Sequence, residues 1–415
     1  MNPLYNLGMR AFDAGISLGA LKSEKIKKLR IGQKEAIDYL RGKIRPGQPY
    51  VWIHAASLGE FEQGRPLIEK IRRENSDVRI LLTFFSPSGY EVRKNFSEVD
   101  AVCYLPLDVK SRVKEFLDVV NPRMAVFVKY EFWGNYLQEL KRRGVPTYII
   151  SSIFRPSQIF FKPWGAMFRN MLRCYTHVYV QDERSRRLLA GIGVTNVTVA
   201  GDTRFDRVTD IMRSCVEIPQ AAAFVEKAPV TIIAGSTWPP DEEYLIPYFN
   251  SHPEFKLIIA PHEVESKRLD AIERSLTRKS CRLSSATLEE AREADCMIID
   301  GYGKLSSIYS YGDIAYVGGG FGVGIHNINE AAVYGMPVLF GPNYHKFKEA
   351  YDLIEAKGAF TFSDIVRFEG ILSRLLTDSE YLAECGNNAS RYIKENFGAT
   401  DVIYGDIKSL LDSLA

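Results

Sequence analysis

The stretch VWIHAASLGEFEQGRPL, residues 51–67, decides the fold. Val51 to Ala55 is apolar or β-prone and predicts a buried strand, Ser57 and Gly59 predict a turn, and a helical pattern begins at Glu60. In open parallel sheets, ligands bind in the crevice beyond the carboxyl ends of the strands, where Glu60 would lie. The spacing from Ser57 to Glu60 also fits a capping box, in which the glutamate only bonds a backbone amide.

The same alternation of strand and helix continues on both sides of this stretch. It predicts one series of strands at 50–55, 79–85, 101–105, 124–129, 146–151 and 177–180, and a second at 230–235, 256–260, 296–300, 314–317 and 337–340. In the first series, helical patterns begin near residues 60, 87, 109, 131, 163 and 182. Repeated βα units of this length indicate parallel sheets covered by helices. The 415 residues therefore predict two doubly wound α/β domains, joined by a short linker near 202–216.

Composition excludes several classes of protein. The 46% hydrophobic and 25% charged residues are typical of a folded chain, and the net charge of +2 indicates no nucleic-acid partner. The six cysteines form no CxxC pair and the six histidines no HxxxH pair, so we expect reduced thiols and no metal site.

The amino-terminal segment combines apolar and basic character. Residues 3–20 are mostly apolar, but Arg10 and Asp13 interrupt them, so the run is too short to span a bilayer. Residues 1–48 carry ten Lys and Arg against four Asp and Glu. This pattern favours peripheral docking on an anionic membrane. A terminal helix packed on the domain, with a solvated basic face, would give the same pattern.

Four segments carry a resemblance to a known family. They are HAASLGEFEQGRPLI (54–68), YEFWGN (130–135), AGSTWPPDEE (234–243) and GGGFGVGIHNINEAAVYGMPVLFGP (318–342). The chain resembles bacterial Kdo transferases, which move 3-deoxy-D-manno-oct-2-ulosonic acid (Kdo) from CMP-Kdo to lipid A precursors. The resemblance implies a GT-B fold of two Rossmann-like domains, an inverting transfer, and no cofactor or metal. It also implies attachment to the cytoplasmic face of the inner membrane.

The resemblance further implies a division of labour along the chain. Residues 1–48 would be membrane-associated, 49–205 would bind the acceptor, 206–395 would bind CMP-Kdo, and a helix at 396–415 would pack back on the first domain.

The resemblance assigns three residues to catalysis. Glu60 would be the base that takes the acceptor proton, with its pKa lowered by the helix amino terminus. Arg204, in GDTRFD, would neutralise charge on the leaving group. Lys129 stands where the family has the first glutamate of a Glu-Thr-Glu-Leu-Trp-Pro-Asn segment, so a cation replaces a carboxylate that assists the transition state. Lys129 would instead bind the Kdo carboxylate or an acceptor phosphate, and Glu131, which matches the family, would contact donor or acceptor.

The glycine-rich run 318–324 precedes a helix, and exposed amides at such a junction attract phosphate. A plain tight connection explains the glycines equally well. The family has His-Asn-Pro-Leu-Glu next and binds CMP with its last four residues. In this chain those residues are Asn327, Ile328, Asn329 and Glu330, of which Glu330 would bind the ribose.

Other expected nucleotide contacts depart from the family. Pro261 and His262 match Pro-Arg, so charge at this contact would depend on pH. Gly303, Lys304 and Leu305 match Gly-Glu-Leu. The remaining candidates, Ser236 and Thr237, end a strand and would bond the donor or cap the next helix.

Two other functions compete with this reading. Sugar-nucleotide 2-epimerases have the same two-domain architecture and a similar phosphate loop, but need no membrane-docking segment. A non-catalytic nucleotide-binding paralogue would explain why Lys129, His262 and Lys304 replace family residues.

Overall fold

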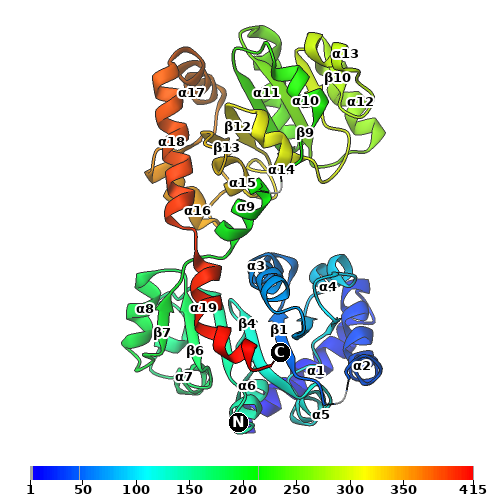
Figure 1. Cartoon of the computed structure of the whole chain (residues 1–415), viewed down its shortest axis with the longest axis vertical. Coiled ribbons are helices and arrows are strands. Elements are labelled where there is room, and N and C mark those ends of the chain that lie inside the picture. The colour runs from blue at the N-terminus through cyan, green and yellow to red at the C-terminus, as the bar shows by residue number, and fades with distance from the viewer. Residues whose placement is uncertain (1–2, 46, 214, 415) are drawn as a thin grey trace. The chain divides into compact units, whose positions relative to one another are not determined.

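The computed structural model describes residues 3–45, 47–213 and 215–414. The description leaves out residues 1, 2, 46, 214 and 415. These residues belong to the predicted amino-terminal segment, linker and carboxy-terminal segment. The contacts divide the chain into two units (Figure 1). The first is Met1–Arg207 with Phe397–Ala415, and the second is Val208–Asn396.

The first unit contains a seven-stranded sheet in the order β3-β2-β1-β4-β5-β6-β7. Its strands, all paired in parallel, are β1 (Tyr50–Ala55), β2 (Arg79–Phe84), β3 (Ala101–Tyr104), β4 (Pro122–Val128), β5 (Thr147–Ser152), β6 (His177–Val180) and β7 (Val197–Val199). All six residues of β1 are buried because helices cover both faces of the sheet. The order reverses between β1 and β4, so this pair forms the switch point at which ligands bind in such sheets.

Alternate residues of β1 serve two hydrophobic cores. Trp52 packs with Phe116 and Phe127 on one face, and Ile53 packs with Phe61 on the other. The helices are α1 (Pro3–Gly19), α2 (Glu24–Lys43), α3 (Leu58–Glu74), α4 (Pro87–Arg93), α5 (Lys110–Val120), α6 (Gly134–Arg142), α7 (Ala166–Leu172), α8 (Glu183–Ala190) and α19 (Ala399–Asp412), with a 3-10 turn at Ile159–Phe161.

The second unit repeats the architecture in the order β10-β11-β9-β8-β12-β13-β14. Its parallel strands are β8 (Thr231–Thr237), β9 (Lys256–Pro261), β10 (Ser280–Arg282), β11 (Cys296–Ile298), β12 (Ile314–Val317), β13 (Val338–Phe340) and β14 (Ala359–Thr361). The switch point lies between β8 and β12. Two doubly wound parallel sheets confirm the predicted α/β class.

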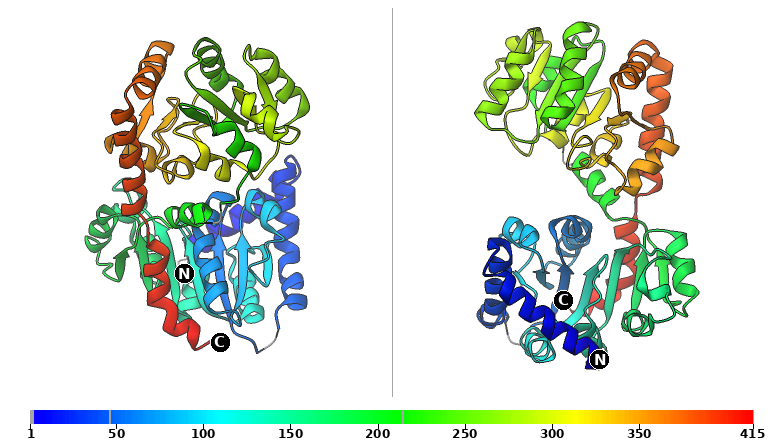
Figure 2. Two further views of the ribbon diagram at one scale, coloured as in Figure 1. Left: turned by 45° about the horizontal axis from the view of Figure 1, so that its top comes forward. Right: turned by 180° about the vertical axis from the view of Figure 1, so that it is seen from behind.

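The helices of the second unit surround this sheet on both faces (Figure 2). They are α10 (Pro219–Val225), α11 (Pro239–Ser251), α12 (Ser266–Ser275), α13 (Leu288–Glu293), α14 (Leu305–Ile308), α15 (Asn329–Ala332), α16 (Lys348–Glu355), α17 (Ile365–Thr377) and α18 (Ser379–Glu395), with a 3-10 turn at Tyr309–Tyr311. No helix in the described residues is long and apolar enough to cross a membrane.

Several elements differ from the prediction. The strands β7, β10 and β14 were not expected, because each has only three residues and lies at a sheet edge with incomplete burial. The expected linker 202–216 contains a helix, α9 (Arg204–Arg213), so this connection is not an extended loop. The helices expected near 131 and 163 begin later, at Gly134 and Ala166.

The last helix, α19, belongs to the first unit. Asp206 accepts hydrogen bonds from the amides of Gly398 (2.7 Å) and Thr400 (2.6 Å), which fixes the start of α19. Farther along, Tyr404 donates to the side chain of Asn75 (2.7 Å), and Ile407 is fully buried. The carboxy terminus therefore completes the core of the amino-terminal unit.

Candidate active site

The switch point of the first sheet brings together residues far apart in sequence. Glu60 lies in the first turn of α3, directly after β1, while Lys129 and Glu131 follow β4, the neighbour of β1. Glu131, His54 and Lys129 all act electrostatically on the Glu60 carboxyl group. The structure thus gathers three predicted residues, Glu60, Lys129 and Glu131, at one edge of the sheet.

Glu60 does not form the capping box that its spacing allows. Ser57 is the N-cap of α3, but its side chain makes no capping bond. Instead, the Glu60 carboxylate bonds the backbone of Ala56, and its Oε2 is buried without a hydrogen-bond partner in the described residues. A buried oxygen without a partner is costly in a folded protein and is typical of a ligand or catalytic site.

The pKa of Glu60 is raised, first by burial and then by the nearby charge of Glu131. The expectation that the helix amino terminus lowers this pKa is therefore wrong, because loss of solvation outweighs the helix dipole here. A raised pKa makes the carboxylate a stronger base.

His54 connects Glu131 to the interior of the sheet. It is fully buried on β1, and its Nε2 lies 2.9 Å from Oε2 of Glu131. Its Nδ1 lies 2.8 Å from Oγ1 of Thr83, which accepts a hydrogen bond from the Trp52 indole (2.8 Å). Nδ1 also lies 3.1 Å from the Thr83 carbonyl oxygen, so the ring links Glu131 to both the side chain and the backbone of Thr83.

Glu131 is held on several sides. Its carboxylate also accepts a hydrogen bond from the Trp133 indole, and its carbonyl accepts one from the Tyr175 hydroxyl. Glu131 as a whole residue is 5% exposed, so its carboxylate lies in a site with little solvent. The network fixes Glu131 in place.

Lys129 adopts a left-handed backbone conformation, with φ of 71°. This region is unfavourable for a lysine, and residues held in it are concentrated at functional sites. The Lys129 ammonium lies 5.6 Å from the centroid of the Tyr130 ring. The turn brings a cation to the end of β4, where the family has a carboxylate.

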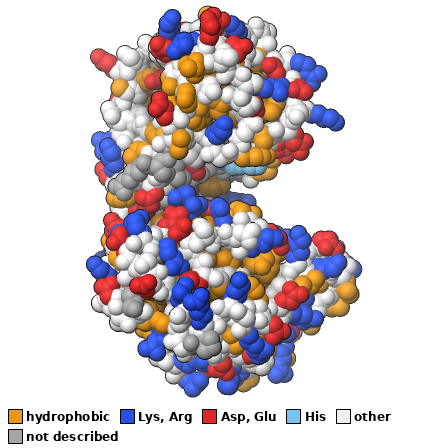
Figure 3. Space-filling view, turned by 45° about the vertical axis from the view of Figure 1, so that its right-hand side comes forward, with side chains coloured by type: hydrophobic (Ala, Val, Ile, Leu, Met, Phe, Trp, Pro, Cys, Tyr) orange, Lys and Arg blue, Asp and Glu red, His pale blue; other side chains and the backbone are white. Residues whose placement is uncertain are grey.

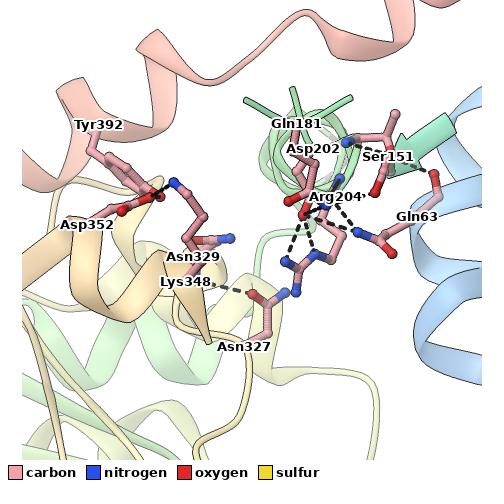
Figure 4. A network of polar contacts seen from close by, with 11 residues as sticks. Gln63, Ser151, Gln181, Asp202, Arg204, Asn327, Asn329, Lys348, Asp352 and Tyr392 are labelled. Atoms are coloured by element: carbon pink, nitrogen blue, oxygen red, sulfur yellow. Dashed lines mark hydrogen bonds and ion pairs between the residues drawn. The ribbon is translucent and has the colours of Figure 1, made fainter. Parts of the chain in front are cut away.

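Arg204 forms an ion pair instead of extending from a solvated loop. It begins α9 and donates to Oδ2 of Asp202 through Nη2 (2.7 Å) and Nε (3.0 Å). The side chains of Gln63 and Gln181 also donate to this aspartate (Figure 4). Burial disfavours the charged form of Asp202, but Arg204 and the hydrogen bonds lower its pKa. Asp202, which the sequence analysis did not select, therefore positions Arg204.

In the second unit, the candidate residues gather at the β8–β12 switch point. Ser236 has a left-handed backbone, with φ of 54°. The Thr237 hydroxyl donates to Glu242 (2.8 Å), and Glu242 forms an ion pair with Arg268. The N-cap of α11 is Trp238, so the capping role considered for Ser236 and Thr237 does not apply.

The glycine-rich loop is closed by its own hydrogen bonds. The Gly319 amide donates to Asp241 Oδ2 (2.9 Å), and the Gly324 amide donates to the Gly319 carbonyl (3.0 Å). A Cβ atom on Gly318 would lie 2.3 Å from the Ser236 carbonyl oxygen, so only glycine fits there. The amides that were expected to be exposed for phosphate are therefore partly bonded within the protein, as the Gly319 amide is. The glycines also allow the loop to pack closely against the strand ends.

The four residues after the loop form a compact group. Ile328 is buried, and Oδ1 of Asn327 accepts a hydrogen bond from the Asn329 amide (3.2 Å). Glu330 accepts from Asn327 (3.1 Å) and from the Ser306 hydroxyl (3.2 Å). Asn329 is 0% exposed, and both polar atoms of its side chain lack a partner in the described residues. A buried side-chain amide without a hydrogen-bond partner is rare, which makes Asn329 a candidate ligand contact.

The bond from Ser306 to Glu330 also joins two predicted nucleotide contacts. Gly303, with φ of 79°, and Lys304 lead into α14, which begins at Leu305. This turn is therefore linked to the group of residues 327–330.

A stack of aromatic rings stands where the family arginine would be. Pro261 ends β9, and His262 stacks on Trp238 with ring centroids 4.7 Å apart. His262 also stacks on His326 at 4.7 Å, and the Trp238 indole donates to Nε2 of His326 (3.3 Å). Burial and the neighbouring His262 lower the pKa of His326. The sequence analysis selected His262 but not its two ring partners.

Among the described residues, no cluster of three or more His, Cys, Asp or Glu side chains has the geometry to hold a metal ion.

Comparison with known proteins confirms the predicted relationship. Residues 28–207 match the family model described as 3-deoxy-D-manno-octulosonic-acid transferase (Kdo transferase). The 3-deoxy-D-manno-octulosonic acid transferase of Aquifex aeolicus is 27% identical over 338 residues, which cover 80% of this chain and 84% of the relative. The protein of the same name from Chlamydophila psittaci is 25% identical over 380 residues, covering 87% and 85%.

The fold is also similar to that of a solved structure. UDP-GlcNAc 2-epimerase from Neisseria meningitidis, bound to UDP-GlcNAc, has a TM-score of 0.59 and 15% identity, covering 88% of this chain and 100% of that one. This similarity confirms the two-domain Rossmann-like architecture of the GT-B type.

Proposed function

We propose that this chain, whose residues 28–207 match the Kdo transferase family model, transfers Kdo from CMP-Kdo to a hydroxyl group of a lipid A precursor. The observation that carries the proposal is the buried Glu60 oxygen at the switch point, which has no partner in the described residues. A base in this position, with a raised pKa, suits an acceptor hydroxyl that must lose its proton during attack.

The reaction is a single displacement. The acceptor oxygen attacks the anomeric carbon of Kdo, its proton passes to Glu60, and the bond from that carbon to the phosphate oxygen breaks as CMP leaves. Attack opposite the leaving group inverts the anomeric centre. Lys129 binds the Kdo carboxylate or an acceptor phosphate, and Arg204, held by Asp202, neutralises charge on the leaving phosphate.

The donor nucleotide binds the second unit. The Asn329 amide, orphaned in the described residues, bonds CMP, and Glu330 with Asn327 binds the ribose hydroxyls. His262 contacts the phosphate from the ring stack. The turn at Gly303, Lys304 and Leu305 and the strand end at Ser236 and Thr237 complete the donor contacts. Metal-independent transfer is part of the proposal, and Arg204 neutralises the phosphate charge that a metal ion would otherwise neutralise.

A lipid acceptor fits the first helix. The side chains of Leu4, Leu7 and Leu18 on α1 are 64–70% exposed and lie along one side of the helix. On another side, Tyr5 donates to Asp108 (2.5 Å), and Phe12 stacks on Phe85, which in turn contacts Trp133 beside Glu131. This exposed apolar face favours docking of α1 in the interface of the inner membrane, on its cytoplasmic side.

Transfer from CMP-Kdo to a tetraacyl lipid A precursor, in detergent with EDTA present, tests the proposal. We expect a Kdo-bearing lipid and free CMP in equal amounts, identified by mass spectrometry. Consumption of CMP-Kdo that depends on added divalent cation would contradict the metal-independent mechanism.

Two other functions remain as outcomes of the same assay. Epimerisation of UDP-GlcNAc, without transfer from CMP-Kdo, would favour a sugar-nucleotide 2-epimerase, whose fold this chain shares. Binding of CMP without either reaction would favour a non-catalytic nucleotide-binding paralogue.

A further inference from the structure

A basic groove lies on the first unit outside the candidate active site. Helices α5, α6 and α7 enclose a cavity of about 810 Å³. Its basic lining residues are Lys110, Lys114, Lys141, Arg142 and Arg173, and its one acidic lining residue is Glu139. No step of the proposed transfer uses these residues.

Two of the five basic side chains are compensated, since Lys114 pairs with Asp118 (3.2 Å) and Arg142 pairs with Glu139. Glu139 is already paired with Arg142 (2.6 Å) and Arg143 (2.9 Å). Lys141 donates to the Arg173 carbonyl (2.8 Å), and Arg173 donates to neutral oxygens only. In the described part of the chain, neither these two nor Lys110 has an ion-pair partner. A groove with this charge attracts an anion with several oxygens, such as a phosphate group.

The groove continues toward the apolar face of α1. A second cavity, of about 550 Å³, is lined by Pro3, Asn6, Leu7 and Arg10 of α1 and by the start of α5. Lys110 lines both cavities, and Leu7 is one of the exposed apolar side chains of α1. Figure 3 shows Lys and Arg side chains next to hydrophobic ones on the surface of this unit.

We propose that the groove between α5, α6 and α7 binds the phosphate headgroups of anionic phospholipids when α1 docks in the membrane. The combination of cations with an adjacent apolar helix matches a bilayer surface, whose headgroups lie directly above the acyl chains. A soluble phosphate would use the cations but not the apolar side chains of α1. The inference rests on the proposed function, because a membrane-bound acceptor gives the enzyme a reason to bind the membrane. Binding to phospholipid can nevertheless be measured without Kdo transfer.

The test is sedimentation of the full chain with vesicles of phosphatidylglycerol and phosphatidylcholine, compared with vesicles of phosphatidylcholine alone. The variant Lys110→Gln/Lys141→Gln removes two charges from the groove. Each basic side chain near an anionic surface contributes about fivefold to the binding constant, so we expect a loss of roughly 25-fold on anionic vesicles only. The matched control is Lys227→Gln/Lys394→Gln, which removes two exposed lysines of the second unit and should bind like wild type.

Unchanged binding by the groove variant, with its thermal unfolding also unchanged, would overturn the inference. Displacement of wild type from anionic vesicles by inorganic phosphate, beyond the effect of sodium chloride at equal ionic strength, would also overturn it and indicate a soluble anion site. The variant Leu4→Gln/Leu7→Gln should weaken binding to both kinds of vesicle.

Transfer in detergent separates this inference from the proposed function. The groove variant should transfer Kdo at the wild-type rate in detergent while losing affinity for anionic vesicles. If the wild-type protein transfers no Kdo, the proposed function is contradicted. The vesicle measurements still show whether the groove binds anionic phospholipid.

Discussion

At the scale of single residues, Glu131 sets the environment of Glu60, the proposed base. It is held by His54 and Trp133, and its charge raises the pKa of Glu60 after the larger effect of burial. Activity should rise with pH as Glu60 ionises. Since Glu131→Gln removes the like charge, the pKa of Glu60 should fall, and the acid limb of log kcat/KM should move to lower pH.

The pH profile of Glu131→Gln is the measurement that checks this coupling. Glu115→Gln, which changes a surface glutamate paired with Arg41, is the matched control and should leave the profile unmoved. A drop in rate at every pH without displacement of the limb would mean that Glu131 supports the structure but not the base.

Asn329 offers a second residue-scale prediction. An unbonded buried amide costs about 1–3 kcal/mol, so Asn329→Leu should raise the free energy of unfolding by about 1 kcal/mol. It should also weaken CMP binding by about tenfold, because the ligand loses its hydrogen bond. Denaturant unfolding and calorimetric titration check the two effects.

The control for Asn329 is Asn388→Leu, which alters a buried asparagine bonded to Arg391. It should lower stability and leave CMP affinity unchanged. Wild-type CMP affinity in the Asn329→Leu variant would contradict the assignment of Asn329 to the donor site.

The residue scale also shows what the sequence could predict about the site. Glu60 was predictable because its strand-to-helix corner and the family resemblance point to the same residue. His54 was not, since a histidine in an apolar strand looks like a core residue. Its only signal was a polar side chain in the strand that leads to Glu60. Burial, which decides the pKa of Glu60, depends on contacts between distant segments that local patterns do not contain.

At the scale of elements, Asp206 connects the start of α19 to the first unit. Its carboxylate accepts hydrogen bonds from the backbone amides of Gly398 and Thr400, which lie near the amino terminus of that helix. Asp206→Ala should lower the free energy of unfolding by about 1–3 kcal/mol, because two backbone amides, one of them buried, lose their acceptor. Denaturant unfolding measures the loss, and hydrogen exchange of residues 399–412 should increase.

The comparison variant is Asp401→Ala, which removes an exposed ion pair with Lys70. Its cost should stay below about 1 kcal/mol, as for most surface pairs. Equal losses in the two variants would show that α19 is held by its apolar face alone.

Elements differed in how well the sequence predicted them. The sequence predicts long buried strands such as β1, β4 and β8 because their residues are predominantly apolar. The edge strands β7, β10 and β14 are three residues long, and pairing with a neighbour defines them more than their own composition does. The sequence predicts a linker where α9 lies, because the polar residues around GDTRFD are typical of a loop.

At the scale of the whole molecule, two units with separate cores should respond differently to a ligand. If CMP binds only the second unit, it should stabilise that unit by about 2.7 kcal/mol at 100 times its Kd. Hydrogen exchange with peptide resolution should therefore slow within 208–396, and the thermal transition of that unit should move up by several degrees. Protection confined to the first unit would contradict the assignment of the donor site.

The fold class was predictable at this scale because both halves repeat the βα pattern. The route of the carboxy-terminal segment into the core of the first unit depends on long-range contacts such as that of Tyr404 with Asn75. The resemblance, and not the local pattern, suggested such a return.

The central claim is that Glu60 is the base in Kdo transfer, and Glu60→Gln tests it most directly. The substitution keeps size and hydrogen bonding but cannot accept the proton. Transfer from CMP-Kdo to the lipid precursor should fall by about 10²–10⁴-fold, while calorimetric titration shows unchanged CMP affinity. A wild-type rate of transfer by the Glu60→Gln variant, with the product confirmed by mass spectrometry, would contradict the account.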